Sequence, residues 1–196
     1  MDATLTELVD ARLAGVRQKP APLGSYILSR YFIFLEAERQ EFKARVPVSL
    51  VCPPMLHLPE ERPLLEWKVP PPPIRLLNRQ VLPFFLAPGC GDTAAHNEAM
   101  ANLLWTGLDW QVHFPEQAAT VAGVQTHEPL PPGAVVQIHS HGRMRSFWSA
   151  TDNADEQGFL IYVVVGRIAT DTPTIQLRVG INGCWCPLRL NHVFTC

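Results

Sequence analysis

Proline is the feature that most limits how this chain can fold. The 196 residues include 19 prolines, and proline normally makes up only about 5% of a sequence. Consecutive prolines stand at residues 53–54, 70–73 and 131–132. Because proline fixes φ and has no N–H to donate, it is excluded from helix interiors and central strands. Each run therefore predicts a boundary between elements, and the four prolines at 70–73 predict a linker in polyproline II geometry.

The linker divides the chain into residues 1–73 and residues 74–196. Apolar residues between 4 and 16 follow the spacing of one helical face, which predicts an amphipathic N-terminal helix. Aromatic and β-branched residues at 26–36 and alternation at 42–51, on either side of a charged turn at 38–41, predict a β-hairpin. We therefore expect the first region to be a small α+β unit that ends in the Pro-rich linker.

The second region has the mixture of strands and short helices that is typical of an α/β domain. After an expected short helix at 92–97, the predicted strands are 99–105, 110–114, 134–139, 159–168, 175–181 and 185–190. The segment 134–139 is nearly all apolar, which is typical of a strand buried on both faces. We therefore predict a mixed sheet flanked by a few helices.

Composition and charge exclude several classes of protein. The formal net charge of −2 and the pI of about 6.4 predict no basic surface for nucleic acid. The longest uncharged apolar stretch, 158–166, is far shorter than the ~18 to 20 residues that cross a membrane. The N-terminus lacks the features of a secretion signal, and the five cysteines form no disulfide framework. We expect a cytoplasmic protein with no nucleic-acid or membrane partner, in which Cys184-Trp185-Cys186 is part of a strand.

A group of metal-ligating residues follows the buried strand. His139 and His141 are two residues apart, so a strand directs both imidazoles to one face, where they can bind one metal ion. Such a pair arises by chance roughly 0.25 times per chain of this composition, but Ser149 and Asp152 extend it to H-x-H-x(7)-S-x(2)-D, with a chance of order 3 in 10,000. Two imidazoles and a carboxylate suit one catalytic Zn²⁺ with a fourth position for water. Alternatively, Ser149 or Asp152 caps a helix at 153–157, and the two roles can coexist.

The segment VVQIHSHGRMRSFWSATD resembles the JAMM (MPN+) metalloproteases, whose signature is a distant glutamate followed by H-S/T-H-x(7)-S-x(2)-D. The resemblance spans about residues 74–196 and implies a cytidine-deaminase-like α/β sandwich. It also implies that His139, His141 and Asp152 bind zinc, that Ser149 holds the reacting oxygen, and that the glutamate is the general acid/base. Gly142 departs from the family, which often has proline after the second histidine.

The motif spacing does not identify the glutamate. A general acid/base must lie within hydrogen-bond reach of the attacking water without binding the metal itself. Glu98 precedes an expected strand and is similar in position to the family's glutamate at the end of its first helix, so it is the preferred candidate. Glu116, which follows a strand only 23 residues before His139, is the second candidate. Glu128, in a loop beside prolines, is the third.

Three further residues are candidate substrate contacts. Arg143 and Arg145 lie in the loop between the ligands, where they would hold an acidic substrate, although exposed loop arginines are commonly only solvated. Trp148 stands next to Ser149 and is a candidate wall of the site, with buried packing as its alternative role. Two acidic residues after the motif, at 155 and 156, are expected in the first turn of the helix, where carboxylates oppose the dipole.

Within the superfamily, the chain resembles the A-type members of bacterial PRTRC gene cassettes, on the segments PEQAA, YVVVGRI and RVGINGCWCPL. These cassettes also encode a ThiF/E1-like protein and a ubiquitin-like protein. The resemblance implies a zinc-dependent metallo(iso)peptidase that hydrolyses a peptide or isopeptide bond at the C-terminal tail of a ubiquitin-like protein. The alternatives are a catalytically silent metal-binding MPN scaffold that docks a ubiquitin-like or E1-like partner, and an amidase acting on small molecules.

Overall fold

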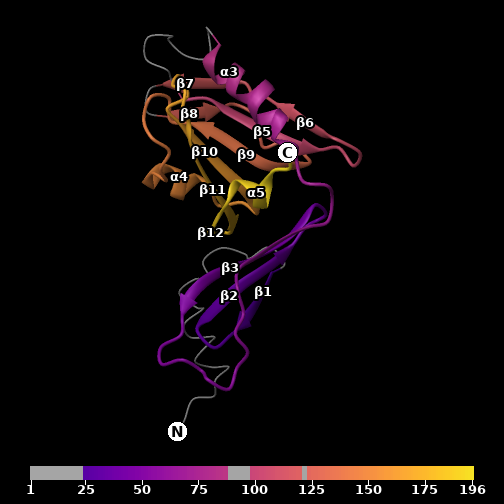
Figure 1. The fold of residues 1–196 in the computed structure, drawn as a ribbon, viewed down its shortest axis with the longest axis vertical. Coiled ribbons are helices and arrows are strands. Elements are labelled where there is room, and N and C mark those ends of the chain that lie inside the picture. Colours follow the sequence, from indigo (N-terminus) through magenta and orange to yellow (C-terminus); the bar gives the residue numbers. More distant parts are fainter. Residues whose placement is uncertain (1–23, 88–97, 121–122) are drawn as a thin grey trace.

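The computed structural model describes residues 24–87, 98–120 and 123–196. The helices expected at 4–16 and 92–97 lie outside these described residues. A four-stranded sheet and a six-stranded sheet make up most of the structure, and a two-stranded hairpin accompanies the larger sheet (Figure 1). None of the helices in the described ranges is long and apolar enough to cross a membrane.

The smaller sheet is antiparallel, in the order β1-β2-β3-β4. Its strands are β1 (Gly24–Leu28), β2 (Phe32–Glu38), β3 (Phe42–Leu50) and β4 (Leu64–Trp67). The charged turn and the second strand of the predicted hairpin are confirmed, but the expected strand at 26–36 is two strands. They are separated by a turn in which the backbone N–H of Ser29 donates to the carbonyl of Phe32. The sequence interpretation also missed β4, which lies within the Pro-rich segment.

The larger sheet has the order β12-β11-β10-β9-β5-β6. Its strands are β5 (Met100–Trp105), β6 (Trp110–His113), β9 (Ala134–Ser140), β10 (Leu160–Gly166), β11 (Thr174–Ile181) and β12 (Cys184–Leu188), so all six predicted strands are present. All pairs are antiparallel except β9 with β10. A parallel pair needs a long crossover, and here the crossover contains helix α4 (Ala150–Asp155).

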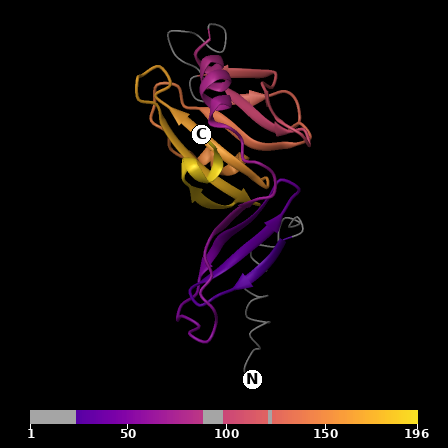
Figure 2. The ribbon, with the colours of Figure 1, turned by 45° about the vertical axis from the view of Figure 1, so that its right-hand side comes forward.

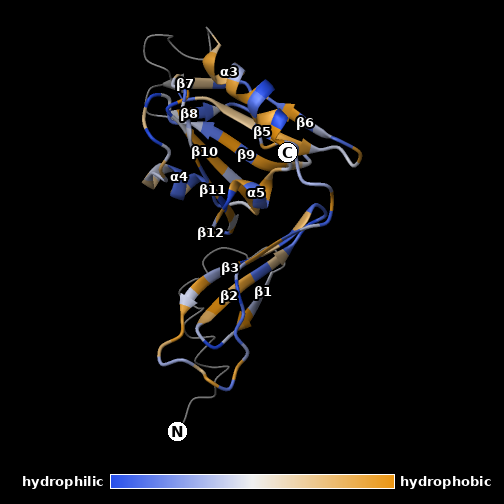
Figure 3. Cartoon of the chain, viewed as in Figure 1, coloured by the Kyte–Doolittle hydropathy of each residue, from blue (hydrophilic) through white to orange (hydrophobic). Residues whose placement is uncertain are grey.

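One face of the larger sheet is covered by a continuous helical segment. It consists of α2 (Ile74–Leu76), the π-helix η1 (Leu77–Val81) and α3 (Leu82–Leu86). Figure 3 shows hydrophobic and hydrophilic residues on this segment, as an amphipathic helix requires. Leu77 and Val81 are fully buried in the core together with residues of the sheet. The sequence indicated only an apolar, proline-interrupted stretch there, because Pro83 stands in the first turn of α3, where proline is tolerated.

The register of the strands gives the two faces of the larger sheet different roles. Ile138 on β9 is paired with Ala101 on one side and Val163 on the other, and all three side chains belong to the hydrophobic core. Successive residues of a strand point to opposite faces. The next residue, His139, therefore lies on the other face, which carries α4 and the polar residues of the site.

The N-terminal sheet extends away from the larger sheet but shares its hydrophobic core (Figure 2). Phe42 on β3 contacts Phe159 edge-to-face, with ring centroids 4.8 Å apart. Arg39, in the turn between β2 and β3, donates hydrogen bonds to the carbonyls of Phe159 and Ala134. Trp67 on β4 donates to the carbonyl of His192. These contacts join residues before the proline run to residues after it, and they fix the two sheets against each other.

The cysteines match the expectation of free thiols. Cys52, Cys184, Cys186 and Cys196, which are the cysteines in the described ranges, form no disulfide. Cys184 and Cys186 belong to β12, so the C-x-C pair is part of a strand, as predicted.

Candidate metal centre

Three side chains converge at the carboxyl end of β9. The Nε2 atoms of His139 and His141 are 3.2 Å apart. Asp152, on α4, places Oδ1 at 3.3 Å from Nε2 of His139 and Oδ2 at 3.6 Å from Nε2 of His141. A tetrahedral ion with ligands at about 2.0–2.1 Å separates those ligands by about 3.3 Å. The spacing of the three side chains therefore fits a single metal ion, and among the described residues they are a group able to hold one.

Helix α4 begins at a capping box that fixes Asp152. The hydroxyl of Ser149 accepts a hydrogen bond from the N–H of Asp152 at 3.0 Å, and the carboxylate of Asp152 accepts one from the N–H of Ser149 at 2.6 Å. Ser149 is therefore a helix cap, one of the two roles predicted for it. Because its oxygen acts as the acceptor, the O–H hydrogen of Ser149 is left to donate elsewhere.

Asp152 is held in its ionised form. Its burial opposes ionisation, but hydrogen bonds to His139 and His141, and the backbone N–H of Ser149, lower the pKa of this carboxyl group well below its ordinary range. Both histidines are nearly fully buried. The site thus combines a buried carboxylate with two imidazoles whose Nε2 atoms face one point, a set of donors that could bind one metal ion.

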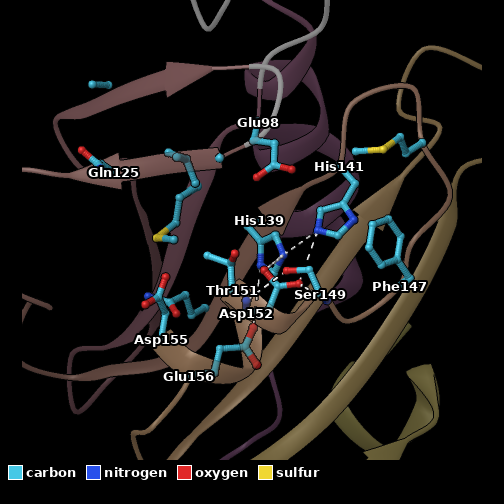
Figure 4. Close-up of a pocket in the computed structure, with 16 residues that line it drawn as sticks. Glu98, Gln125, His139, His141, Phe147, Ser149, Thr151, Asp152, Asp155 and Glu156 are labelled. Atoms are coloured by element: carbon cyan, nitrogen blue, oxygen red, sulfur yellow. Dashed lines mark hydrogen bonds and ion pairs between the residues drawn. The ribbon is translucent and has the colours of Figure 1, made fainter.

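Glu98 lies just before β5, and its side chain is buried at the same pocket (Figure 4). Hydrogen bonds between Ala99 and Ser140 join this segment to the end of β9. Burial raises the pKa of Glu98; His141 and His139 oppose the rise, and Asp152 adds to it.

The other two candidate glutamates are placed elsewhere. Glu116 and Glu128 are exposed, and neither lines the pocket of the histidines. The carboxylate of Glu128 instead accepts a hydrogen bond from the N–H of Glu116 and lies 3.6 Å from His113. Of the three glutamates that the sequence proposed, the structure thus brings only Glu98 to the candidate metal ligands.

The pocket has a volume of about 550 Å³. Besides the residues already described, its walls come from β5, α4, the loop after β9, and a hairpin of β7 (Gln117–Thr120) and β8 (Gly123–Thr126). The sequence interpretation missed this hairpin. The side-chain amide of Gln117 accepts from the N–H of Met100 at 2.7 Å and donates to its carbonyl at 3.2 Å. These two hydrogen bonds hold the hairpin against β5, close to Glu98.

The predicted substrate contacts do not line the pocket. Arg143 and Arg145 are exposed on the loop after β9. Trp148 packs against the guanidinium of Arg178, whose Cζ lies 3.8 Å from the ring centroid. Phe147, by contrast, lines the pocket and contacts His141, with ring centroids 4.4 Å apart.

Glu156 is the main feature of the site that the sequence interpretation missed. It was expected in the first turn of a helix, but it is the C-cap of α4, where the helix dipole does not favour a carboxylate. It is buried and forms an ion pair with Arg178 on β11. Burial raises the pKa of Glu156 to about 7, although Arg178 opposes the rise. The spacing of four residues from Asp152 was a signal that both carboxylates share one helix face.

The chain matches no protein-family model and no curated protein sequence.

Proposed function

We propose that this chain binds one Zn²⁺ and is a JAMM-type metallo(iso)peptidase. His139, His141 and Asp152 would hold the ion. The observation that carries the proposal is that this three-ligand set shares one pocket with the buried carboxylate of Glu98 and with Ser149. A ligand set without a nearby acid/base would fit a structural metal equally well, so the position of Glu98 favours catalysis.

Each protein group has a distinct role in amide hydrolysis. When bound, zinc lowers the pKa of a water ligand to about 7 and polarises a carbonyl group. Glu98 accepts the proton of the attacking water and delivers it to the nitrogen of the leaving amine, which completes the cleavage of the C–N bond. The hydroxyl of Ser149, whose hydrogen the capping box leaves free, donates to the oxyanion that forms on the carbonyl.

The pocket suits an extended polypeptide. Val124 and Gln125 of β8 line it, and β8 forms a two-stranded hairpin with β7. An extended tail that lies along Val124 and Gln125 would add to this hairpin through backbone hydrogen bonds, so its binding would depend little on its side chains. The proposed substrate is the C-terminal tail of a ubiquitin-like protein, which the family resemblance supports, with an E1/ThiF-like protein as a further partner in a cytoplasmic setting.

The first experiment measures the metal. Purified full-length protein is reconstituted with zinc, freed of excess ion and analysed for metal content. One zinc per chain is expected for the wild type and much less for His139→Ala. The absence of stoichiometric zinc from the wild type would exclude the proposed mechanism.

The second experiment separates an enzyme from a scaffold. A ubiquitin-like protein with a C-terminal extension is incubated with the wild type, with Glu98→Gln and with Glu116→Gln as the matched control. The wild type and Glu116→Gln should cleave equally, whereas Glu98→Gln should bind zinc but lose activity. Equal cleavage by Glu98→Gln would assign the acid/base role to another residue. Zinc binding without cleavage in any variant would favour the scaffold.

A further inference from the structure

We propose that Glu156 is a positioning residue for the metal ligand His139: its carboxylate accepts the Nδ1–H of that imidazole and so keeps Nε2 directed at the metal. The inference rests on the metal site of the proposed function, but not on peptidase activity. It assigns a role to a buried ion pair that the hydrolytic mechanism does not use.

The geometry places the free oxygen of Glu156 behind His139. Nε2 of His139 faces the other two ligands, so Nδ1 is the ring nitrogen on the far side. Oε1 of Glu156 lies 3.9 Å from that Nδ1. This oxygen is buried and accepts no hydrogen bond from the described residues. A shift of about 1 Å would bring the two atoms to hydrogen-bond distance.

The rest of the Glu156 side chain is held in place by its neighbours. Its Oε2 accepts a hydrogen bond from Nε of Arg178 at 2.7 Å. The Arg178 guanidinium lies against the rings of Trp148 and Trp185, with its Cζ 3.8 and 4.5 Å from their centroids. Its Nη1 donates to Oδ1 of Asn153 at 2.7 Å. With Oε2 fixed in this way, Oε1 is the oxygen that remains for His139.

The free-energy cost of burying the Glu156–Arg178 ion pair favours a functional reason for its presence. Burying two opposite charges costs desolvation free energy that their attraction only partly offsets, so apolar residues of similar size would often be at least as stable. A histidine ligand usually donates its second ring N–H to a carboxylate or carbonyl, which fixes its tautomer and makes it more basic. His141 has no such acceptor, since its Nδ1 is buried without a partner among the described residues. The effect is therefore expected to be specific to His139.

The test measures zinc affinity of the full chain by competition with a chromogenic chelator. Glu156→Ala should raise the zinc Kd about 10- to 100-fold, and Glu156→Gln, which keeps an acceptor oxygen, should raise it less. Asp155→Asn is the matched control: it removes a charge one residue away, from an exposed carboxylate that lines the same pocket. Its Kd should stay within about threefold of the wild type.

A second variant and a second readout distinguish the loss of the His139 contact from misfolding. Glu156→Leu combined with Arg178→Met removes both buried charges at similar volume, so it should fold and still bind zinc weakly. In the cobalt-substituted protein, the visible absorption bands should shift in Glu156→Ala and in the double variant but not in Asp155→Asn.

The outcomes separate this inference from the proposed function. If Glu156→Ala and the double variant both keep the wild-type zinc Kd and cobalt spectrum, the positioning role of Glu156 is refuted and the proposed function is unaffected. A wild type that binds zinc but cleaves no tail would refute the peptidase and leave the positioning role intact. A wild type that binds no zinc would overturn both.

Discussion

Ala99 and Ser140 are joined by two reciprocal hydrogen bonds, one to the Ser140 side chain and one from its backbone. The Ala99 N–H donates to the Ser140 hydroxyl at 3.0 Å, and the Ser140 N–H donates to the Ala99 carbonyl at 2.9 Å. Ser140 is the middle residue of the His-Ser-His motif, and Ala99 directly follows Glu98. One residue between the two histidines thus positions the acid/base candidate beside them.

We predict that Ser140→Ala separates catalysis from metal binding. The Ala99 N–H would lose its acceptor while buried, which costs about 1–3 kcal/mol of stability. A small displacement of Glu98 should reduce kcat about 10- to 100-fold, while the zinc Kd stays within about threefold because both histidines remain. Ser140→Thr, which keeps the hydroxyl, should recover most of the activity. Parallel measurements of cleavage and zinc affinity test this, and equal losses in the two would contradict it.

Gly166, at the end of β10, is predicted to tolerate no side chain. A Cβ at this position would overlap backbone atoms of Met144, Arg145 and Ser146 in the loop that leads from His141 to Ser149. Gly166→Ala should therefore destabilise the fold by about 3 kcal/mol and weaken zinc binding, because the loop connects the ligands. Gly123→Ala is the control, since its Cβ would meet no atom within 4 Å. Similar unfolding midpoints for the two variants in urea would refute this account.

Arg39 is predicted to hold the two sheets together. Besides its bonds to the carbonyls of Phe159 and Ala134, it forms an ion pair at 2.6 Å with Glu41, whose side chain is only 7% exposed. Arg39→Ala leaves this carboxylate buried without its partner, and we expect a loss of about 3 kcal/mol. Arg62→Ala, at a side chain that is 84% exposed, should change stability by less than about 0.5 kcal/mol. Chemical denaturation of both variants measures the difference.

Glu36, on β2, should make stability dependent on acid pH. It lies 2.8 Å from Lys43 and 2.7 Å from Arg45. Burial opposes its ionisation, but these two cations lower the pKa of Glu36 below its ordinary value of 4.5. A carboxyl group with a lowered pKa stabilises the fold above its unfolded-state pKa, and this contribution is lost as the pH falls through the folded-state pKa.

Glu36→Gln should therefore be less stable than the wild type at pH 7, by about 0.5–1 kcal/mol. The difference should shrink as the pH is lowered below about 4. Thermal unfolding from pH 7 to pH 3 measures it. The control is Glu66→Gln on β4, at an exposed residue with no ion pair in the described part of the chain. A difference that stays constant with pH would exclude the ionic explanation.

The prediction from sequence was most successful where the signal was local. Alternation and apolar runs located all six strands of the larger sheet, because a strand buried on one or both faces needs apolar residues at fixed positions. It failed at β4 and at the β7–β8 hairpin. Those strands have only four residues each, and pairing with a neighbouring strand stabilises them more than their own composition does.

The sequence by itself determined the candidate metal ligands, because His139, His141 and Asp152 lie within fourteen residues of one another on a single strand–loop–helix unit. Their spacing is set by the periods of the strand and of the capped helix. The tertiary structure alone decided which glutamate faces them and which carboxylate stands behind His139. Glu98 is 41 residues from His139, and Arg178 is 22 residues from Glu156. Their positions depend on which strands pair and in what register, a property of the whole sheet that local sequence spacing does not encode.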